Sequence, residues 1–272
     1  MAKSNVPDQY YTKPTVANEL LTWLWQQMLP KSDKYLEPAA GDGSFSSLLP
    51  ENKTEAIDLL PLSANIKQQD FMEYYPQPGF SYMVIGNPPF GKNSSLAIKF
   101  FNRSANFAEA IAFVVPRTFK KHSVIGRLHP FFHLLAEREV PKNAFLENGK
   151  EKDVPTLFQV WVKQKTPRVV SHTQPKESDF IFVTKQDTPD FSIQRVGANA
   201  GKIRTEFDDR AIASHYFVRA KEVNLKKKVQ KTLEAIDWQE VKSNSAGNPS
   251  ISKRELLELY SKQRVAESFK KK

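Results

Sequence analysis

The sequence predicts an α/β fold, with helices on both faces of a mostly parallel sheet, followed by a small C-terminal module that is β-rich and ends in a helix. Short apolar runs alternate with polar turns, as expected for buried parallel strands. Several of these runs end at Pro or Gly, which forces the chain to turn. The length of 272 residues accommodates one such core and leaves about a hundred residues for a second unit. We therefore predict domains over residues 1–165 and 166–272.

The elements of the first domain follow in order from these runs. Residues 34–36 predict a strand, and the turn after it leads into a helix through Leu48 and Leu49. Two further strands are predicted at 54–60 and 66–72, and a buried strand at 82–86. Apolar residues at helical spacing predict a helix over 96–107. The remaining strands are expected at 110–115, 134–140 and 156–162, the last two as a closing antiparallel pair.

The strand at 82–86 ends in a turn that carries two acceptor groups and an aromatic ring. Its residues are Asn87, Pro88, Pro89 and Phe90. Ligand sites of open α/β sheets lie at such strand ends. A side-chain amide, a prolyl carbonyl and a flat ring suit an amino-substituted base, so these four residues are our candidate catalytic residues. The alternative is a polar turn with Phe90 packed onto the core.

A second loop, rich in small residues, follows the strand at 34–36. Its candidate cofactor-binding residues are Glu37, Pro38, Ala40, Gly41 and Gly43. The loop lacks both the Lys-Ser/Thr pair of a phosphate loop and the third glycine of a dinucleotide fingerprint, which disfavours phosphate binding. An acid at the strand end repels phosphate and attracts an ammonium group. That polarity suits S-adenosylmethionine (SAM).

Together, the acid-Pro-x-x-Gly-x-Gly loop and the downstream Asn-Pro-Pro-Phe resemble the paired signature of SAM-dependent amino-group methyltransferases. The likeness is greatest to the γ-ordered DNA adenine-N6 enzymes, which implies a Rossmann-like class I sheet. Tyr11 and Thr12 resemble the aromatic-Thr-Pro segment that precedes the cofactor loop in that family, although Lys13 is inserted before Pro14. The resemblance covers roughly the first 165 residues and implies that Tyr11, Thr12 and Asn87 contact the cofactor.

Two further acids stand at predicted strand ends. Asp58 can accept both ribose hydroxyls of a nucleotide-like cofactor, as acids at this place do in nucleotide-binding sheets. The resemblance implies that Asp70 accepts from the amino group of the cofactor's adenine and that Phe71 lies against its ring. For Asp70, the alternative is a helix N-cap.

Composition excludes several classes of function. There are no cysteines, which rules out disulfides, thiolate zinc sites and cysteine nucleophiles, including the covalent route to ring-carbon methylation of cytosine. The five histidines lack ligand spacing, so no metal site is expected. No apolar run approaches a membrane span and the first residues lack the apolar core of a secretion signal, so we expect a cytoplasmic protein without a membrane partner. The net charge of +10 favours a polyanionic partner.

The candidate nucleic-acid contacts are cations on loops. Arg117, Lys120 and Lys121 follow the strand at 110–115 and are expected to face the active cleft, or else to form a solvated loop. Lys202 lies in a predicted turn of the second module, whose strands are expected at 180–183, 191–196 and 214–219. Residues 221–272 hold thirteen basic and seven acidic residues, and Ser252 with Glu255 predicts a capping box for a terminal helix. This module is our candidate target-recognition unit.

These features predict a SAM-dependent enzyme that methylates the N6 amine of adenine in DNA. Because the target base is stacked in a duplex, it must be flipped, and Phe90 is expected to stack on it. The nearest alternative is an RNA adenine-N6 methyltransferase. N4-cytosine methylation, glutamine methylation in proteins and a catalytically silent nucleic-acid-binding subunit fit less well. The sequence names neither a recognition site, nor a restriction partner, nor an oligomeric state.

Overall fold

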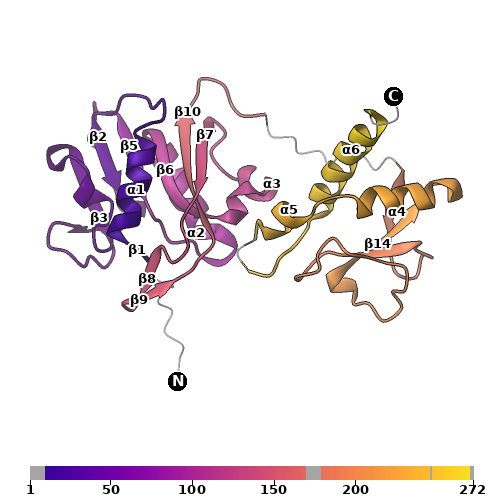
Figure 1. Ribbon diagram of the computed structural model, residues 1–272. Coiled ribbons are helices and arrows are strands. Elements are labelled where there is room, and N and C mark those ends of the chain that lie inside the picture. Colours follow the sequence, from indigo (N-terminus) through magenta and orange to yellow (C-terminus); the bar gives the residue numbers. More distant parts are fainter. Residues whose placement is uncertain (1–9, 170–178, 246, 270–272) are drawn as a thin grey trace. The chain divides into compact units, whose positions relative to one another are not determined.

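The structure is a computed structural model that describes residues 10–169, 179–245 and 247–269. The chain divides into two compact units, Met1–Val170 and Ser171–Lys272, and each is described by itself (Figure 1). The start of the chain, on which the expectation about a secretion signal rests, lies outside the described residues. Within the described ranges, no helix is long and apolar enough to cross a membrane.

A seven-stranded sheet forms the first unit, in the order β4-β3-β2-β5-β6-β10-β7. Its strands are β2 (Lys34–Glu37), β3 (Thr54–Asp58), β4 (Lys67–Gln68), β5 (Tyr82–Gly86), β6 (Ala108–Pro116), β7 (Phe132–Glu139) and β10 (Thr156–Lys163). The first five strands of that order pair in parallel, and β10 runs antiparallel between β6 and β7. The structure thus confirms the predicted α/β fold, a Rossmann-like, mostly parallel sheet with an antiparallel closing pair.

Two eleven-residue helices cover opposite faces of this sheet: α1 (Pro14–Leu24) and α2 (Ser95–Ala105). Alternate residues of the central strand β5 point to opposite faces, as the pleat requires. Val84 belongs to the apolar cluster that includes α2, whereas Met83 and Ile85 belong to the cluster that includes α1. The near-continuous burial of β5 therefore has a direct cause, because both of its faces are covered.

The helix predicted through Leu48 and Leu49 is wrong. The chain after the glycine-containing loop forms only a 3₁₀ turn, η1 (Ser46–Leu48), and Leu48 is exposed. Pro50 follows at once, and residues before proline disfavour helical dihedrals. The side of the sheet next to this loop is consequently less covered by helices than the sequence suggested.

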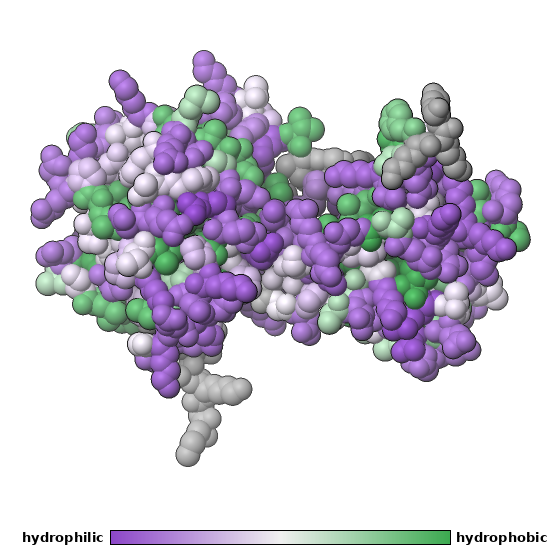
Figure 2. All heavy atoms as spheres, in the orientation of Figure 1, coloured by the Kyte–Doolittle hydropathy of each residue, from purple (hydrophilic) through white to green (hydrophobic). Residues whose placement is uncertain are grey.

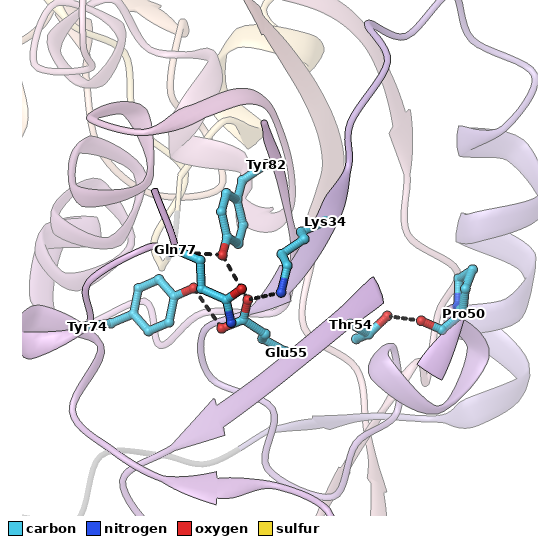
Figure 3. Close-up of polar contacts among 7 residues, drawn as sticks. All are labelled: Lys34, Pro50, Thr54, Glu55, Tyr74, Gln77 and Tyr82. Carbon is cyan, nitrogen blue, oxygen red and sulfur yellow. Dashed lines mark hydrogen bonds and ion pairs between the residues drawn. The ribbon is translucent and has the colours of Figure 1, made fainter. Parts of the chain in front are cut away.

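A polar network closes the amino-terminal edge of the same sheet (Figure 3). The Glu55 carboxylate accepts hydrogen bonds from the hydroxyls of Tyr74 and Tyr82, at 3.0 and 2.8 Å. Lys34 forms an ion pair with Glu55 at 3.3 Å, and the backbone N–H of Gln77 donates to the Tyr82 hydroxyl at 3.0 Å. These bonds tie the segment before β5 to the starts of β2 and β3. The network therefore serves the fold at the edge opposite to the carboxyl ends of the strands, where ligands of open α/β sheets bind.

A small three-stranded sheet adds to the first unit, in the order β1-β8-β9. It consists of β1 (Tyr11–Thr12), β8 (Phe145–Glu147) and β9 (Lys150–Lys152), all antiparallel. Asn148 and Gly149 join β8 to β9, both with positive φ, at 51° and 76°. A short helix, α3 (His122–Ile125), follows β6. The hairpin lies between β7 and β10 in the chain, and it holds the N-terminal strand.

The second unit is a four-stranded antiparallel sheet with three helices. Its strands β11 (Phe180–Val183), β12 (Phe191–Gln194), β13 (Ile203–Arg204) and β14 (His215–Ala220) take the order β11-β14-β12-β13. The helices are α4 (Lys226–Glu234), α5 (Gln239–Ser243) and α6 (Lys253–Phe269). The predicted capping box at the start of α6 is confirmed, since Glu255 accepts from the Ser252 N–H at 2.7 Å and donates its own N–H to Ser252 Oγ at 3.2 Å.

Hydrophilic side chains dominate the face of the protein shown in Figure 2, and the apolar residues on it are scattered. Scattered apolar residues are normal for a soluble surface, whereas a large continuous patch would indicate a hydrophobic partner. On this face, polar and charged chemistry is the feature that a ligand would meet.

Candidate functional site at the carboxyl edge of the sheet

Three polar side chains stand at the carboxyl ends of neighbouring strands. Glu37 ends β2, Asp58 ends β3 and Asn87 directly follows β5. β2 pairs with β3 on one side and with β5 on the other, so the strand order reverses direction there. In open α/β sheets, ligands bind in the crevice at such a topological switch point. The topology therefore brings together three of the residues that the sequence singled out.

The loop after β2 is bound to the end of β3 by two hydrogen bonds. The Ala40 N–H donates to the Ile57 carbonyl at 3.0 Å, and the Gly41 N–H donates to Asp58 Oδ2 at 2.8 Å. Asp58 Oδ1 accepts from the Leu60 N–H at 2.8 Å. A carboxylate has about four lone-pair sites, so two amides leave acceptor capacity for further donors such as hydroxyls. The predicted ribose contact of Asp58 is compatible with this arrangement and stays a prediction.

Glu37 lies inside the loop rather than on its surface, with 2% of its area exposed. Its Oε2 accepts from the Ser46 N–H at 2.7 Å, which closes the loop over the strand end. Gly86 has φ of +149°, which favours glycine, and a Cβ placed there would lie in tight contact with Glu37 Cγ, at 3.2 Å. Burial raises the pKa of Glu37 to about 8, against the opposing effect of the hydrogen bonds from Ser46. The predicted attraction for an ammonium group thus requires this carboxyl to give up a proton near neutral pH.

The strand β1 places Tyr11 directly over the glycine loop. A Cβ on Gly41 would come within 2.6 Å of Tyr11 Cε1, and Gly41 has φ of +54°. Both facts require glycine at this position. Burial raises the pKa of the Tyr11 hydroxyl, and the charges of Asp58 and Asp42 add to the effect. The Tyr11 ring and the glycine loop therefore form one surface, and the carboxylates of Asp58 and Asp42 lie near it.

Thr12 has a buried hydroxyl that lacks a partner. Its side chain is 3% exposed, and Oγ1 has no hydrogen bond among the residues that the structure describes. The carbonyl of Thr12 accepts from Ser44 Oγ at 2.6 Å, which ties this residue to the glycine loop. Buried hydroxyls are normally paired, and an unpaired one costs about 1–3 kcal/mol. An unpaired hydroxyl next to a glycine loop is a polar position that a ligand could satisfy.

The amide of Asn87 is held in one orientation. Its Nδ2 donates to the backbone carbonyl of Tyr10 at 2.8 Å. A carbonyl can only accept, so the amine side of Asn87 must face Tyr10 and the amide oxygen must face away. Sequence reasoning missed Tyr10 as a functional residue, because a backbone carbonyl leaves no trace in residue type.

The rest of the Asn-Pro-Pro-Phe turn is partly buried. Pro88 is buried, and Pro89 and Phe90 are half-buried. Phe90 packs against the apolar clusters of both sheet faces, and its carbonyl accepts from the N–H groups of Leu96 and Ala97 at 3.1 and 3.2 Å. Phe90 therefore packs onto the core, as the alternative interpretation of this turn expected. The residue is only half-buried, so part of it stays exposed three positions after Asn87. Its predicted stacking on a base stays a prediction.

Asp70 and Phe71 have structural roles in this conformation. Asp70 Oδ1 caps the 3₁₀ turn η3 (Phe71–Glu73) by accepting from the Met72 N–H at 2.8 Å. Phe71 is 2% exposed, and its ring contacts those of Phe100 and Tyr74 in the core. Little of the Phe71 ring is therefore open to a ligand. The cofactor contacts that the resemblance implies for these two residues stay predictions.

The candidate phosphate-binding cations of the first unit are engaged with carboxylates. Arg117 pairs with Glu139 at 2.7 Å and Lys120 pairs with Glu137 at 3.1 Å, both on β7. These contacts direct the two cations toward the edge strand β7, and the expectation that they face the active cleft stays a prediction. Lys121 is half-buried beside them. Lys202 is exposed in the turn before β13 of the second unit.

The hairpin β8–β9 is the element of the site that sequence reasoning missed. Tyr11 and Thr12 pair with Leu146 and Phe145, and the Lys13 N–H donates to the Ala144 carbonyl at 2.9 Å. These bonds place β1 against the glycine loop. An Asn-Gly pair between short strands is a hairpin signal, so Asn148-Gly149 was the trace of this element in the sequence.

Comparisons with known proteins assign no family to the chain. No family model matches the chain, and no curated protein matches it. Among solved structures, it is similar to a crystal structure from Pyrococcus horikoshii described as "a putative RNA methyltransferase". The sequence identity is 18% and the TM-score 0.43, over 58% of this chain and 87% of that one. The fold assignment therefore rests on the strand order and directions described above.

Proposed function

We propose that this chain is a SAM-dependent methyltransferase that acts on the exocyclic N6 amine of adenine in DNA. The observation that carries the proposal is the fixed amide of Asn87 at the switch point of the sheet. Its Nδ2 is engaged by the Tyr10 carbonyl at 2.8 Å, so Oδ1 is left as a neutral acceptor. A neutral acceptor beside an open strand end suits an amino group on a heterocycle.

The chemistry of such an amine explains why acceptors are needed. The nitrogen lone pair is delocalised into the ring, so the amine is a poor nucleophile until acceptors bind its hydrogens and favour a pyramidal nitrogen. Asn87 Oδ1 accepts one hydrogen in this proposal, and the Pro88 carbonyl accepts the other. In the part of the chain that the structure describes, no backbone N–H is found bound to the Pro88 carbonyl. Because the acceptors are held by the backbone, catalysis here depends on positioning.

The residues around the glycine loop fit SAM. Thr12 offers a buried hydroxyl without a partner, and Asp58 retains acceptor capacity for ribose hydroxyls. Glu37 supplies a carboxyl that becomes an anion when a cationic group approaches it. When bound, SAM supplies an electrophilic methyl group on a sulfonium sulfur. The protein's part is to hold the amine in line with that methyl group, which removes much of the entropic barrier.

DNA is the proposed substrate because of the resemblance to adenine-N6 enzymes, the aromatic residue at position 90 and the net charge of +10. A base stacked in a duplex cannot reach the end of β5, so the target adenine is extruded in this proposal. The half-buried ring of Phe90 then supplies an apolar surface for one face of the base.

The experiment supplies labelled SAM with DNA, RNA or protein as separate acceptors. We expect label in DNA, and we expect nucleoside analysis to find it as N6-methyladenine. Asn87→Ala should remove the signal, whereas Asn52→Ala should not, because Asn52 is an exposed asparagine on a different loop. Label in RNA alone, in protein, in cytosine or in no acceptor would contradict the proposal.

A further inference from the structure

A broad hollow of about 620 Å³ opens on the first unit, away from the strand ends that form the candidate site. Residues of helix α2 form one wall, and residues of the turn after α3 form another; Figure 1 labels both helices. Its lining contains three permanently charged cations, Lys99, Arg103 and Arg127, and no carboxylate. A concave surface lined by charge of one sign concentrates counter-ions of the other sign. The hollow is therefore suited to an anion.

The wall formed by α2 is a polar stripe along one side of the helix. Lys99, Asn102, Arg103 and Asn106 are spaced at i, i+3, i+4 and i+7, which places them on a common face. The opposite side of α2 is buried in the core through Ala97, Ile98, Phe101 and Ala105. At about 1.5 Å of rise per residue, the stripe is about 10 Å long. Its charges thus form a row rather than a single point.

The second wall is fixed in place by hydrogen bonds from both sides. Asn102 donates to the Arg127 carbonyl at 2.9 Å and accepts from the His129 N–H at 2.7 Å. Behind the turn, the guanidinium of Arg168 binds the carbonyls of Ile125, Leu128, His129 and Phe132. Those carbonyl oxygens face a cation, so their partial negative charge is offset. Asn102 and Arg168 thus hold in place the turn that carries Arg127.

Two of the three cations lack a protein counter-ion. Lys99 and Arg127 are exposed, and neither forms an ion pair with a residue that the structure describes. Arg103 donates to the Tyr74 carbonyl, and its guanidinium lies 5.8 Å from the centre of the Tyr75 ring, which is 82% exposed. By contrast, Arg117 and Lys120 are neutralised by β7. Lys99 and Arg127 therefore give the hollow two positive charges that no described carboxylate offsets.

We propose that the hollow binds the phosphodiester backbone of a polynucleotide strand. Guanidinium and ammonium groups with side-chain amides are the usual protein contacts to phosphate oxygens. A strand in a duplex carries one phosphate per about 3.4 Å of axis, so a stripe of about 10 Å meets about three phosphates. The ligand's identity rests on the proposed function, but its binding does not require methyl transfer.

The helix that carries the stripe, α2, begins close to the Asn-Pro-Pro-Phe turn. The Phe90 carbonyl accepts from the Ala97 N–H at 3.2 Å, and Lys99 follows Ala97 by two residues on the helix. In this proposal, a strand that presents a base at Phe90 continues along α2 toward the cations of the row. The hollow thus guides the strand beyond the target base and contributes affinity without choosing a sequence.

The test compares two double variants of the full-length chain. Lys99→Gln with Arg127→Gln removes the two unpaired cations of the hollow. Lys31→Gln with Lys53→Gln removes the same charge from exposed positions outside it. Binding of a labelled single-stranded DNA and of the same sequence in RNA is measured by fluorescence anisotropy over a series of salt concentrations. Circular dichroism verifies that each variant is folded, and both substitutions lie at exposed positions.

We expect the hollow variant to bind about tenfold more weakly at 0.1 M salt. The slope of log K against log salt should fall by about 1.4, since each lost phosphate contact on a single strand contributes about 0.7. The control variant should lose much less affinity, and its salt slope should fall much less. Equal effects of the two variants would overturn the proposal. Asn87→Ala separates the two proposals, because it should abolish methyl transfer while it keeps the wild-type salt slope. If the hollow variant loses salt slope while the wild-type chain transfers no methyl group, the result supports phosphate binding in the hollow and contradicts the proposed function.

Discussion

Replacement of Glu37 by glutamine should change how the stability of the protein depends on pH. The carboxyl is 2% exposed and accepts from the Ser46 N–H at 2.7 Å. Its environment raises its pKa from 4.5 to about 8, because burial disfavours the charged form. Glutamine has the same shape, keeps an acceptor for the Ser46 amide and carries no titratable proton. The variant thus removes the titration and retains the contact.

The sign of the effect follows from the proton that each state holds. Below pH 4.5, Glu37 is protonated in both the folded and the unfolded chain, and its contribution to stability is fully present. Between pH 4.5 and about 8, the folded chain holds a proton that the unfolded chain has released. The free energy of unfolding therefore falls as pH rises, by about 1.4 kcal/mol per unit and by about 5 kcal/mol in total.

The assay is urea unfolding followed by tryptophan fluorescence between pH 5 and pH 8. Trp23, Trp25 and Trp161 lie in the first unit, so they report chiefly on the sheet that contains Glu37. Other titrating groups affect wild type and variant alike and cancel in the difference between them. We expect the wild type to lose about 4 kcal/mol relative to Glu37→Gln over this range. A difference that is independent of pH would refute the reasoning.

The same titration gives a second measurement on Glu37. If a cationic group of SAM binds beside this carboxyl, SAM affinity should rise with pH up to about 8 in the wild type, because the proton no longer has to be displaced. Calorimetry at several pH values measures this, and Glu37→Gln should show a flat profile. A rising profile in the glutamine variant would exclude Glu37 as its source.

The remaining predictions concern the amide, the glycine loop and the buried hydroxyl. Asn87→Ala should lower kcat by about 10²-fold or more while SAM affinity, measured by calorimetry, stays within a few fold; full activity would remove its role. Gly41→Val should weaken SAM binding at least about tenfold, since its Cβ would lie 2.6 Å from the Tyr11 ring. The control is Gly79→Val, because Gly79 also has a positive φ, of +84°, but no neighbour within 4 Å of its Cβ position. An equal loss of SAM affinity in both variants would point to backbone strain alone. Thr12→Val should leave urea stability unchanged or raise it by about 1 kcal/mol, yet weaken SAM binding; unaltered affinity would show that the hydroxyl does not meet the cofactor.

The sequence predicted the main sheet well because its strands carry a local signal. Tyr82–Gly86 is apolar throughout and ends at two prolines, and the structure has β5 over the same residues. The turn at Asn87 and the glycine loop could likewise be placed at strand ends, where parallel pairing then brings them to one edge. Parallel strand order thus brings two loops that were predicted separately into one candidate site.

The parts that sequence reasoning missed depend on contacts between residues far apart in the chain. Tyr10 orients Asn87 across 77 positions, and the pairs of Arg117 and Lys120 with β7 arise only when the sheet closes. The strands of the hairpin β8–β9 have three residues each, too few for a periodic pattern. At Glu37, residue type indicated an acid, but only burial shows that its pKa is raised to about 8.

The most direct test of the central claim is to map modified bases in genomic DNA from cells that express the chain. The proposal predicts N6-methyladenine within a defined sequence context, and its loss when Asn87→Ala is expressed at the same level. Adenines without methylation in the wild-type cells, or the same methylation with both proteins, would contradict the claim that the amide of Asn87 presents an adenine amine for methyl transfer.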